Sequence, residues 1–358
     1  MNTGNINIKD IARLAGVGVA TVSRVINNTG EVKEATQKRV REIIKEYNYV
    51  PNNSARNLKR SQSNTVCVLM KGIANPVFND MLSIIQKKSI DNHYNIMVQQ
   101  IDQDEDELDA AIVQMKEKRL RGIILLGGII KNRGNKFKEL DIPLVMVTSN
   151  EADNISADEF SSIAIDDRKA AYEATKYLLQ LGHRKIAFMA SELENYGIMK
   201  LRLEGYKDAL NEAGIPYDET LTENARSFSI KSGYQAFQKL NQRCGGKFTA
   251  VFAIADTLAI GCLRAAKESG YQLPEDLSVM GFDGIEFGAY YSPSLTTVRQ
   301  PYEYMAEQAI FMMCGLLDNE DNRHMVLNAE IVERESCAKR GESVSYTHLR
   351  AHETDQYL

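Results

Sequence analysis

The amino-acid sequence predicts a small all-α helix-turn-helix head followed by a larger α/β body of two doubly wound subdomains. Three observations support this fold class. The first 62 residues are basic whereas the remainder is acidic, apolar residues near the start of the chain recur at helical spacing, and apolar strands alternate with helices from residue 65 onward. A chain of 358 residues has room for this arrangement, because domains typically hold about 100–150 residues.

The overall composition excludes several classes of protein. With 25% charged and 44% hydrophobic residues, the chain is too ordinary for a disordered or fibrous protein. No apolar run approaches the ~18–20 residues that span a bilayer, and residues 1–5 lack the features of a signal peptide. Five Cys without a Cys-x-x-Cys pair favour neither a disulfide framework nor a zinc site. We therefore expect a cytoplasmic protein with no membrane segment, no metal and no cofactor.

The distribution of charge is the first indication of a partner. Residues 1–62 contain 11 Lys/Arg and 5 Asp/Glu, whereas the other 296 residues contain 32 and 43. A small basic segment on an acidic body suggests that the head alone binds a polyanion. A chance fluctuation of surface charge is the alternative that charge by itself leaves open.

The first fifty residues predict three short helices. The first has an apolar stripe at i, i+3, i+4 and i+7, formed by Ile8, Ile11, Ala12 and Ala15. Gly16 ends this helix, and Gly18 can cap a second helix over 19–27, whose inward side chains are Val22, Val25 and Ile26. A third helix over about 33–47 is buried through Val40, Ile43, Ile44 and Tyr47. Two helices joined by a tight glycine turn form the motif whose second helix enters the major groove of DNA.

The outward face of the second predicted helix carries side chains suited to DNA. Thr21 and Ser23 can donate hydrogen bonds to phosphates, which positions the protein without reading sequence. Arg24 has the fork that binds guanine O6 and N7. Val19 and Ala20 can make only apolar contacts, for example to a thymine methyl group. The residues that point away from the core are Val19, Ala20, Arg24 and Asn27. A three-helix packing module that never touches DNA is the alternative.

Three stretches of the head are specific in sequence. They read Ile-Lys-Asp-Ile-Ala-Arg-Leu-Ala-Gly-Val over 8–17, Ala-Thr-Val-Ser-Arg-Val-Ile-Asn over 20–27 and Tyr-Asn-Tyr-Val-Pro-Asn over 47–52. Together they resemble the DNA-binding head of lactose-repressor (LacI/GalR) family regulators. The resemblance adds further DNA contacts at Gly18, Tyr49, Asn52 and Ala55. Gly18 departs from the family, which usually has Ser as the helix cap, but Gly is also accepted at an N-cap.

Residues 52–60 are too few and too polar to form a stable lone helix, and residues 61–64 after them resemble a linker. In the family, the matching stretch is a hinge that becomes helical only when two subunits sit on an operator. Leu58 matches the leucine that is wedged into the minor groove and kinks the duplex. Ser54 is more polar than the apolar residue often found there. A plain basic linker is the alternative interpretation.

The body reads as alternating strands and helices. Apolar strands are predicted at 65–70, 96–100, 122–126, 143–148, 162–165, 185–189, 250–253 and 277–282. Helical stretches between them include 167–181, 200–213 and 256–269. This alternation indicates parallel sheets with helices on both faces, and the number of strands suits two subdomains better than one large sheet. Ligands of such folds bind beyond the carboxyl ends of the strands, so a cleft between two lobes is the natural site.

The body also carries stretches that resemble the same family. They are Asn-Pro-Val-Phe at 75–78, Leu-Gly-His-Arg-Lys-Ile-Ala-Phe at 181–188, Arg-Leu-Glu-Gly-Tyr at 202–206, Ala-Asp-Thr-Leu-Ala-Ile-Gly at 255–261, and the segments 274–283 and 295–301. The resemblance covers about residues 6–340. It implies a head over 1–50, a hinge over 51–63 and a periplasmic-binding-protein-like effector and dimerisation domain over 64–340. The implied N-lobe is about 64–162 and 294–323, and the implied C-lobe is about 163–293 and 324–340, with crossings near Ser162, Ser294 and Arg323.

The resemblance also implies which residues contact a small-molecule effector. Arg202 matches the arginine that holds effector oxygens, and a guanidinium beside the Asp283 carboxylate could grip neighbouring hydroxyls from both sides. Alternatives are a surface salt bridge from Arg202 to Glu204 or Asp208, and a turn-capping role for Asp283. Phe78 could stack on a ring or belong to the core. The full set of expected contacts is Asn75, Phe78, Thr148, Ile198, Arg202, Ala255 and Asp283.

Several of these positions depart from the sugar-binding pattern of the family. Thr148 stands where some sugar-responsive members have Asp, and Ile198 stands where Ser or Thr often donates to the ligand. Ala255 replaces a common Asn, and Gly284 follows Asp283 in place of a second carboxylate. The loss of hydrogen-bond partners argues against a simple lactose-like sugar. A modified or acidic sugar, or another metabolite, is the expectation from these departures.

The sequence offers little for catalysis. It contains no Gly-x-Ser-x-Gly, His-Glu-x-x-His or phosphate-binding Gly-x-x-x-x-Gly-Lys-Ser/Thr motif. His183 and His324 are isolated, and His93 falls at a predicted helix end. The acidic run 102–107 looks metal-like, but it is the kind of helix start that the helix dipole favours. We therefore expect neither an enzyme nor a metal site.

The last residues are expected to be a non-native tail. The family's chain normally ends soon after a strand like Val-Glu-Arg-Glu-Ser-Cys, here 332–337. Residues 344–354, Val-Ser-Tyr-Thr-His-Leu-Arg-Ala-His-Glu-Thr, resemble the in-frame translation of a transposase-type sequencing adapter. Residues 343–358 are therefore not expected to belong to the fold.

The combined prediction is a homodimeric, effector-responsive transcriptional regulator that acts as a repressor at palindromic operator DNA. A sugar or sugar derivative bound between the lobes would change the affinity for the operator, and the two affinities would be reciprocally coupled. Whether the effector releases or tightens DNA binding does not follow from the sequence. The alternatives are a global regulator gated by a protein partner on the lobe surface, and a solute-binding protein, which the missing export signal disfavours.

Overall fold

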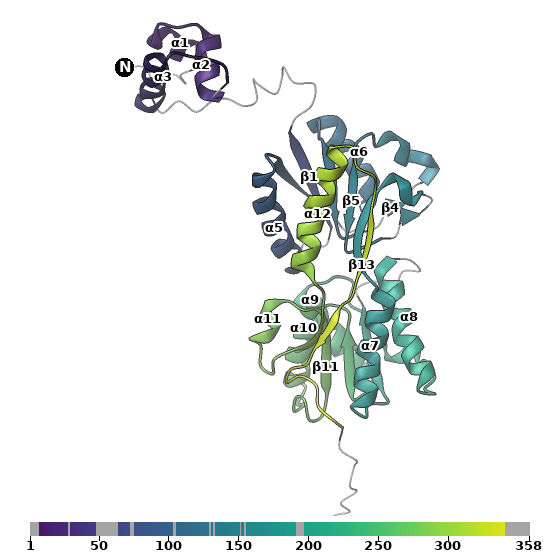
Figure 1. The fold of residues 1–358 in the computed structure, drawn as a ribbon. Coiled ribbons are helices and arrows are strands. Elements are labelled where there is room, and N and C mark those ends of the chain that lie inside the picture. Colours follow the sequence, from purple (N-terminus) through teal and green to yellow (C-terminus); the bar gives the residue numbers. More distant parts are fainter. Residues whose placement is uncertain are drawn as a thin grey trace, which may run out of the picture. The chain divides into compact units, whose positions relative to one another are not determined.

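The computed structural model describes residues 7–27, 29–47, 64–71, 75–102, 105–128, 130–131, 133–150, 152–153, 155–190 and 197–340. The chain divides into two compact units, Met1–Ser63 and Asn64–Leu358. We call the first unit the head and the second the body, and each is described by itself. Figure 1 shows the elements of both units in sequence colours.

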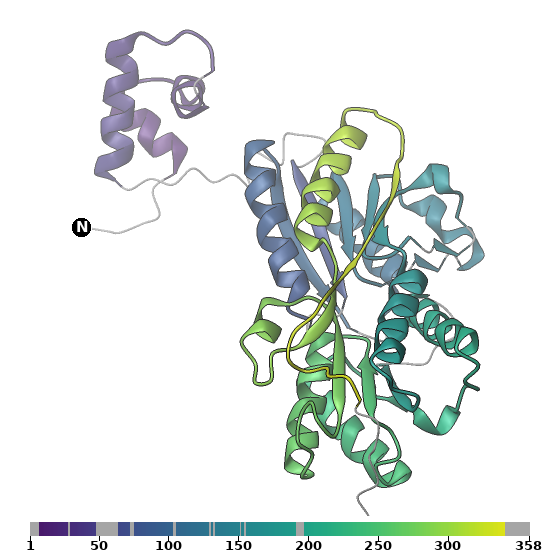
Figure 2. The ribbon, with the colours of Figure 1, turned by 60° about the horizontal axis from the view of Figure 1, so that its bottom comes forward.

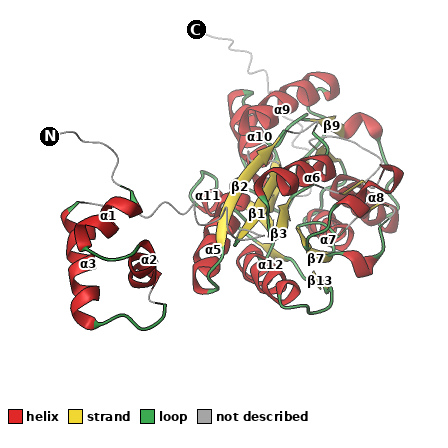
Figure 3. Ribbon diagram, turned by 90° about the horizontal axis from the view of Figure 1, so that it is seen from above, coloured by secondary structure: helices red, strands yellow, loops and turns green. Residues whose placement is uncertain are grey.

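The head contains the three predicted helices, α1 (Ile8–Ala15), α2 (Val19–Asn27) and α3 (Glu34–Glu46), which Figure 3 shows in red. The side chain of Asn7 caps α1 and pairs reciprocally with Asp10, and α1 ends at Gly16 in the left-handed conformation with φ 62°. The helices pack around a small apolar core of Ile11, Ala12, Ala15, Val22, Val25 and Val40. The helix-turn-helix prediction is therefore confirmed.

The first lobe of the body, here called the N-lobe, is a six-stranded parallel sheet. Its strands are β1 (Thr65–Lys71), β2 (Asn95–Ile101), β3 (Gly122–Leu126), β5 (Leu144–Val147), β7 (Ser161–Ile165) and β13 (His324–Leu327). They lie in the order β13-β7-β5-β3-β1-β2. Its helices are α5 (Val77–Asp91), α6 (Glu107–Lys118) and α12 (Tyr302–Leu317).

Alternate residues of the N-lobe strands face different helices, as the two-residue period of a strand requires. Val68 and Ile124 belong to the core that α5 and α12 cover, whereas Leu69 and Ile123 belong to the core that α6 covers. Figures 1 and 2 show α5 and α12 side by side against the sheet. The sheet is thus buried on both faces, which explains why its strands read as continuous apolar runs.

The second lobe, here called the C-lobe, is also a six-stranded sheet. Its strands are β8 (Ile186–Ala190), β9 (Thr222–Asn224), β10 (Ala250–Ala253), β11 (Ser278–Asp283), β12 (Thr296–Arg299) and β14 (Glu330–Val332). Their order is β14-β12-β11-β10-β8-β9, and all pairs are parallel except β12 with β14. Its helices are α7 (Asp167–Gln180), α8 (Gly197–Glu212), α9 (Ile230–Cys244), α10 (Asp256–Glu268) and α11 (Glu286–Ala289).

Short elements complete the body. These are β4 (Ile130–Lys131) paired with β6 (Ala152–Asp153), and the 3₁₀ helices η1 (Arg133–Glu139), η2 (Ala157–Glu159) and η3 (Glu219–Leu221). None of the helices within the described ranges is long and apolar enough to cross a membrane.

Two glycines let α9 and α10 of the C-lobe touch backbone to backbone. A Cβ on Gly233 would lie 2.3 Å from the carbonyl oxygen of Leu258, and a Cβ on Gly261 would lie 2.1 Å from that of Ile230. Any larger residue would push the helices apart. This close packing sets the position of the first turn of α10, which carries Asp256 toward the end of the sheet.

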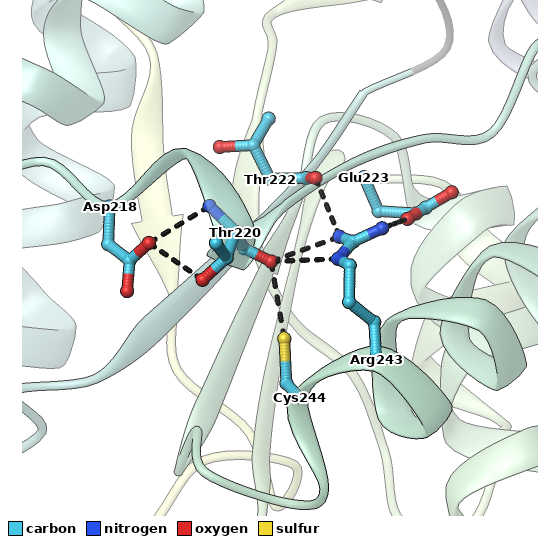
Figure 4. A network of polar contacts seen from close by, with 6 residues as sticks. All are labelled: Asp218, Thr220, Thr222, Glu223, Arg243 and Cys244. Atoms are coloured by element: carbon cyan, nitrogen blue, oxygen red, sulfur yellow. Dashed lines mark hydrogen bonds and ion pairs between the residues drawn. The ribbon is translucent and has the colours of Figure 1, made fainter.

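The edge strand β9 is held by a side chain from α9 (Figure 4). Arg243 donates from Nε and Nη2 to the carbonyl of Thr220, at 3.1 and 3.0 Å, and from Nη2 to that of Thr222, at 2.9 Å. It also forms an ion pair with Glu223. The Cys244 thiol donates to the same Thr220 carbonyl at 3.2 Å. Arg243 therefore satisfies backbone acceptors that a sheet edge would otherwise leave open.

The chain crosses between the lobes three times, and each crossing falls later than expected. The expected positions were near Ser162, Ser294 and Arg323. Instead, β7 lies wholly in the N-lobe sheet, so the first crossing follows Ile165. Strand β12 pairs with β11 of the C-lobe, which moves the second crossing to 300–301, and β13 pairs with β7, which moves the third to 328–329. A strand that is buried on both faces is apolar in either lobe. Its sequence pattern therefore could not show which of the two sheets it joins.

Candidate nucleic-acid interface and ligand site

Helix α2 of the head presents the predicted DNA-reading face. Val22 and Val25 are buried against α1 and α3. Gly18, Val19, Ala20 and Arg24 are exposed, and Thr21 and Ser23 are half-buried. The stem of Arg24 passes close to the turn at Gly30, where a Cβ would lie 3.6 Å from Arg24 Cδ. The split between a buried and an exposed face is therefore the one that a recognition helix needs.

Some predicted DNA contacts lie outside the described residues. They are Tyr49, Asn52, Ala55 and Leu58, together with the side chain of Asn27. The hinge prediction over 51–63 also lies there.

The body brings polar side chains from both lobes together at the carboxyl ends of the strands. We call this cluster the interlobe site, and its members are Asn75, Asp167, Arg202, Asp256, Asp283 and Gln300. Asn75 precedes α5 of the N-lobe, whereas Gln300 occupies the second crossing. All six side chains are buried. The position agrees with the rule that open α/β sheets bind ligands beyond their carboxyl edges.

Asp283 is the centre of the interlobe site. It ends β11 with φ 113°, a backbone conformation that residues other than Gly rarely adopt. Its Oδ2 accepts a hydrogen bond from Asn75 Nδ2 at 2.6 Å, and its Oδ1 accepts one from Gln300 Nε2 at 2.7 Å. Burial raises the pKa of Asp283 to about 6, while the charge of Arg202 and the two amide donors oppose that rise. The sequence did not reveal Gln300, although it lies in the family-like stretch 295–301.

Arg202 is buried on α8 and is not the surface salt bridge that the sequence left open. Its Nε donates to Asp167 Oδ1 at 2.7 Å, its Nη1 donates to the carbonyl of Ile254 at 2.6 Å, and its guanidinium carbon lies 3.5 Å from the centre of the Phe282 ring. Glu204 and Asp208, the alternative partners, pair with Arg168 instead. The expectation that Arg202 and Asp283 flank a ligand needs one correction, because the direct partner of Arg202 is Asp167.

Asp256, the first residue of α10, fixes the turn that follows Asp283. Its Oδ2 accepts from the backbone N–H groups of Gly284 and Ile285 at 2.9 and 2.8 Å, and its Oδ1 accepts from the Thr297 hydroxyl at 2.6 Å. Burial, followed by the charge of Asp283, raises the pKa of Asp256 to about 8. Asp256 therefore orients Asp283 through the backbone. The sequence marked it only as part of the stretch 255–261.

In the described part of the chain, the side chains of the other predicted effector residues form no hydrogen bond with this cluster, although the backbone N–H of Phe78 donates to the Asn75 carbonyl at 3.2 Å. Phe78 is 9% exposed and belongs to the N-lobe core, which favours the core alternative over stacking on a ligand. Thr148 has φ 71° and donates its backbone N–H to Ile163. Ile198 is half-buried on α8, and Ala255 is fully buried at the start of α10. Asn75, Arg202 and Asp283 are thus the predicted residues that the structure brings together.

The remaining polar motifs have structural partners. Asp106 caps α6, accepting from the N–H groups of Leu108 and Asp109 at 3.0 Å, so the end of the acidic run, residues 106–107, is a helix start as predicted. Within that run, Glu107 is buried and forms an ion pair with Lys71 at 3.0 Å. The Nε2 of His183 lies 3.2 Å from the carbonyl of Ala338, which ties the end of the described body to the C-lobe sheet.

Comparison with known proteins agrees with both units. Residues 7–52 match the model of bacterial regulatory proteins of the lacI family, and residues 145–337 match a periplasmic binding protein-like domain. The HTH-type transcriptional regulator MalR of Clostridium butyricum is 40% identical over 335 residues, which cover 93% of this chain and 99% of that protein.

Solved structures give the same result. A transcriptional regulator CelR–cellobiose complex is similar with a TM-score of 0.68 and 28% identity, covering 92% of this chain and 99% of that one. The lac repressor dimer bound to operator and the anti-inducer ONPF shares the fold with a TM-score of 0.76 and 24% identity, over 94% and 100% of the two chains. The chain therefore belongs to the lacI family of bacterial regulatory proteins and is a DNA-binding transcriptional regulator.

Proposed function

We propose that this regulator is a cytoplasmic homodimer that represses transcription from a palindromic operator and is controlled by an uncharged, hydroxyl-rich sugar bound at the interlobe site. In this proposal residues 1–50 read DNA, residues 51–63 form the hinge, and residues 64–340 bind the effector and the second subunit. The observation that carries the proposal is the buried carboxylate of Asp283 beside Arg202, at the carboxyl ends of the strands of both lobes.

The charges of the interlobe site support an uncharged ligand. Within its six members, two carboxylates, Asp167 and Asp283, face one guanidinium, which is already paired with Asp167 at 2.7 Å. The third acid, Asp256, has a pKa raised to about 8 by burial and is mostly neutral near pH 7. An anionic ligand would add charge of the same sign beside Asp283 in a buried site, which is costly. Hydroxyl groups can donate to the Asp283 carboxylate at no such cost. A neutral sugar therefore takes the place of the acidic sugar that the sequence suggested.

Arg202 supplies the complementary donor. Its Nε and Nη1 are used by Asp167 and by the carbonyl of Ile254. We assign Nη2, which has no partner among the described residues, to an oxygen of the ligand. A donor and an acceptor side by side recognise adjacent hydroxyl groups of a sugar, each of which can both donate and accept. The related CelR structure holds cellobiose, which makes neutral disaccharides the first ligands to examine.

Thermal unfolding of the full chain against neutral and anionic sugars tests this proposal. Cellobiose, maltose and ribose form the neutral set, and glucose 6-phosphate and gluconate form the anionic set. A specific ligand at ~100 times its Kd should stabilise the body by about 2.7 kcal/mol. Asp283→Asn should abolish the shift, whereas Arg168→Ala, which removes an exposed arginine beside α8, should retain it. Stabilisation by the anionic set alone would contradict the proposed ligand class.

The DNA-binding part is tested separately by selecting operator sequences from a random duplex pool. We expect enrichment of a palindrome, because two heads related by a two-fold axis read inverted half-sites. Addition of the stabilising sugar should change the amount of selected DNA that remains bound to the protein. A chain that selects no sequence would contradict the repressor proposal even if a sugar binds.

A further inference from the structure

A buried hydrogen bond joins the two lobes at the interlobe site. Asn75 Nδ2 donates to Asp283 Oδ2 at 2.6 Å, although the residues are 208 positions apart in sequence. Asn75 lies just before the N-lobe helix α5, and Asp283 ends the C-lobe strand β11. The side chains are 7% and 2% exposed, so water does not compete for them. Any motion that separates the lobes at this point must break the bond.

Each end of this bond is held in place by its own lobe. The Oδ1 of Asn75 accepts from the backbone N–H of Val77 at 3.2 Å, which turns Nδ2 toward Asp283. Gln300 holds the other oxygen of Asp283 at 2.7 Å, and its backbone N–H donates to the Asp283 carbonyl at 3.2 Å. Because both side chains are already oriented, little conformational entropy is lost when the bond forms.

The two donors to Asp283 differ in what happens when the lobes separate. Gln300 follows β12 directly and is tied to the backbone of Asp283, so it can stay with the C-lobe. Asn75 belongs to the N-lobe and must leave. A ligand that enters between the lobes therefore finds Oδ2 covered by Asn75, whereas Oδ1 keeps its partner.

We propose that the Asn75–Asp283 hydrogen bond is a latch that holds the lobes together in the ligand-free protein, with the Asn75 amide standing in for a ligand hydroxyl on Oδ2. Binding of the effector exchanges one donor for another, so the latch lowers the apparent affinity for the effector and sets the lobe arrangement that the ligand must change. The exchange with a ligand rests on the proposed function. The latch itself concerns the chain alone.

A reversal of donor and acceptor tests the latch. Asn75→Asp keeps an oxygen for the Val77 N–H but loses the amide donor and places a second carboxyl group against Asp283. Because such a pair can share a proton, this variant is measured at about pH 9, where ionisation of both groups makes them repel each other. Asp283→Asn keeps an oxygen for Gln300, but its amide then faces the Asn75 amide. The double variant restores one donor and one acceptor with their places exchanged, so the hydrogen bond would run from the C-lobe to the N-lobe.

The readout is the distance between the lobes in solution, measured by pulsed electron paramagnetic resonance on the full chain without ligand or DNA. Nitroxide labels are attached to cysteines introduced at the exposed positions Glu117 on α6 and Lys239 on α9. Labelled chain is mixed with excess unlabelled chain, so that distances between subunits do not contribute. A sample without the introduced cysteines shows the background from the five native ones, which are buried or half-buried.

The expected result is a single distance population in the unaltered chain and a second, longer population in each single variant. A hydrogen bond to a charged group corresponds to a change of about tenfold or more in the ratio of separated to closed lobes. The double variant should return to the original distribution. Asn79→Asp, which alters an exposed amide on the same helix, should leave the distribution unchanged.

Unchanged distances in both single variants would overturn the latch, as would a double variant that stays as open as the single ones. Separation in Asn79→Asp would also overturn it, because added charge on α5 would then suffice. If Asp283→Asn fails to fold, Asn75→Ser takes its place, since Ser retains an oxygen for Val77 but lacks the amide donor. Failure to bind an operator or a sugar would leave all these distances as they are, so the latch and the proposed function fail separately.

Discussion

Arg202 and Asp167 form a buried ion pair, with Nε 2.7 Å from Oδ1, directly after the chain has crossed from the N-lobe into the C-lobe. Asp167 is the first residue of α7, and β7 of the N-lobe ends two positions earlier at Ile165. A ligand oxygen bound by Arg202 would therefore act on a side chain that also holds one of the crossings. This connection gives a physical route from the interlobe site to the angle between the lobes.

The Arg202–Asp167 pair predicts a large loss of stability when one partner is removed. Asp167→Asn leaves the guanidinium buried with a neutral partner, and breaking a buried pair typically costs about 3–5 kcal/mol. The exposed Arg168 pairs with Asp208 at 2.7 Å, and Arg168→Ala should cost no more than ~1 kcal/mol. Urea unfolding of the full chain measures both. Equal losses in the two variants would show that burial does not strengthen the Arg202 pair.

Asp256 predicts a fall in stability as the pH rises toward about 8. Burial and the charge of Asp283 raise the pKa of Asp256 to about 8, from an ordinary value of 3.8. A group whose pKa is higher in the folded state stabilises most at low pH, and this contribution is lost as pH rises through the folded value. The free energy of unfolding should therefore decrease by up to ~1.4 kcal/mol per pH unit from about pH 4 to about pH 8, and level off above that.

The variant Asp256→Asn should flatten that slope, because an amide resembles the protonated acid and does not titrate. Asp141→Asn, which alters an exposed carboxylate in the N-lobe, should retain the slope of the unaltered chain. Urea midpoints at a series of pH values provide the measurement. A slope that persists in Asp256→Asn would assign the pH dependence to another group.

His183 predicts the opposite dependence on the acid side. Burial lowers the pKa of His183 below its ordinary value of 6.5, because the neutral ring is enclosed between Thr249 and Ser278. A base whose pKa is lower in the folded state stabilises fully above the unfolded value, and stability is lost as the pH falls below about 6.5 toward the folded value.

Asp256 acts in the opposite direction over the same range, so the loss from His183 is read by comparison: from about pH 7 to about pH 5 the unaltered chain should lose stability relative to His183→Gln in thermal unfolding. His93→Asn is the matched control, because His93 is exposed and Asn tolerates its φ of 61°. The control should lose as much stability on acidification as the unaltered chain. If the stability of His183→Gln depends on pH in the same way as that of the unaltered chain, the His183 imidazole does not cause the loss of stability at acid pH.

Arg24 on α2 predicts a specific loss of DNA binding. Removal of a bidentate contact to guanine should cost about 1–3 kcal/mol, or roughly 5- to 150-fold in affinity for the selected operator. Arg13→Ala removes an exposed arginine from α1 and controls for loss of positive charge. Fluorescence anisotropy at fixed salt compares both variants on operator and random duplexes. If Arg24→Ala weakens both duplexes equally, Arg24 contacts phosphate and does not read a base.

Much of the architecture could be predicted because it depends on local patterns. The stripe of Ile11, Ala12 and Ala15 and the αL turn at Gly16 specify the first helix of the head within a few residues. The apolar runs of β1 and β3 indicate a doubly buried parallel sheet for the same reason. The exposed face of α2 followed directly from placing Val22 and Val25 inward.

The sequence by itself determined the helix-turn-helix head, the α/β class of the body and the presence of Asn75, Arg202 and Asp283 in one site. Only the tertiary structure decided which sheet β7, β12 and β13 join, that Arg202 pairs with Asp167, and that Asn75 and Gln300 hold Asp283. The physical reason is the separation along the chain over which each kind of interaction acts. Helix periodicity and capping act over a few residues, whereas these partnerships join residues 35 and 208 positions apart and depend on burial that no local pattern encodes.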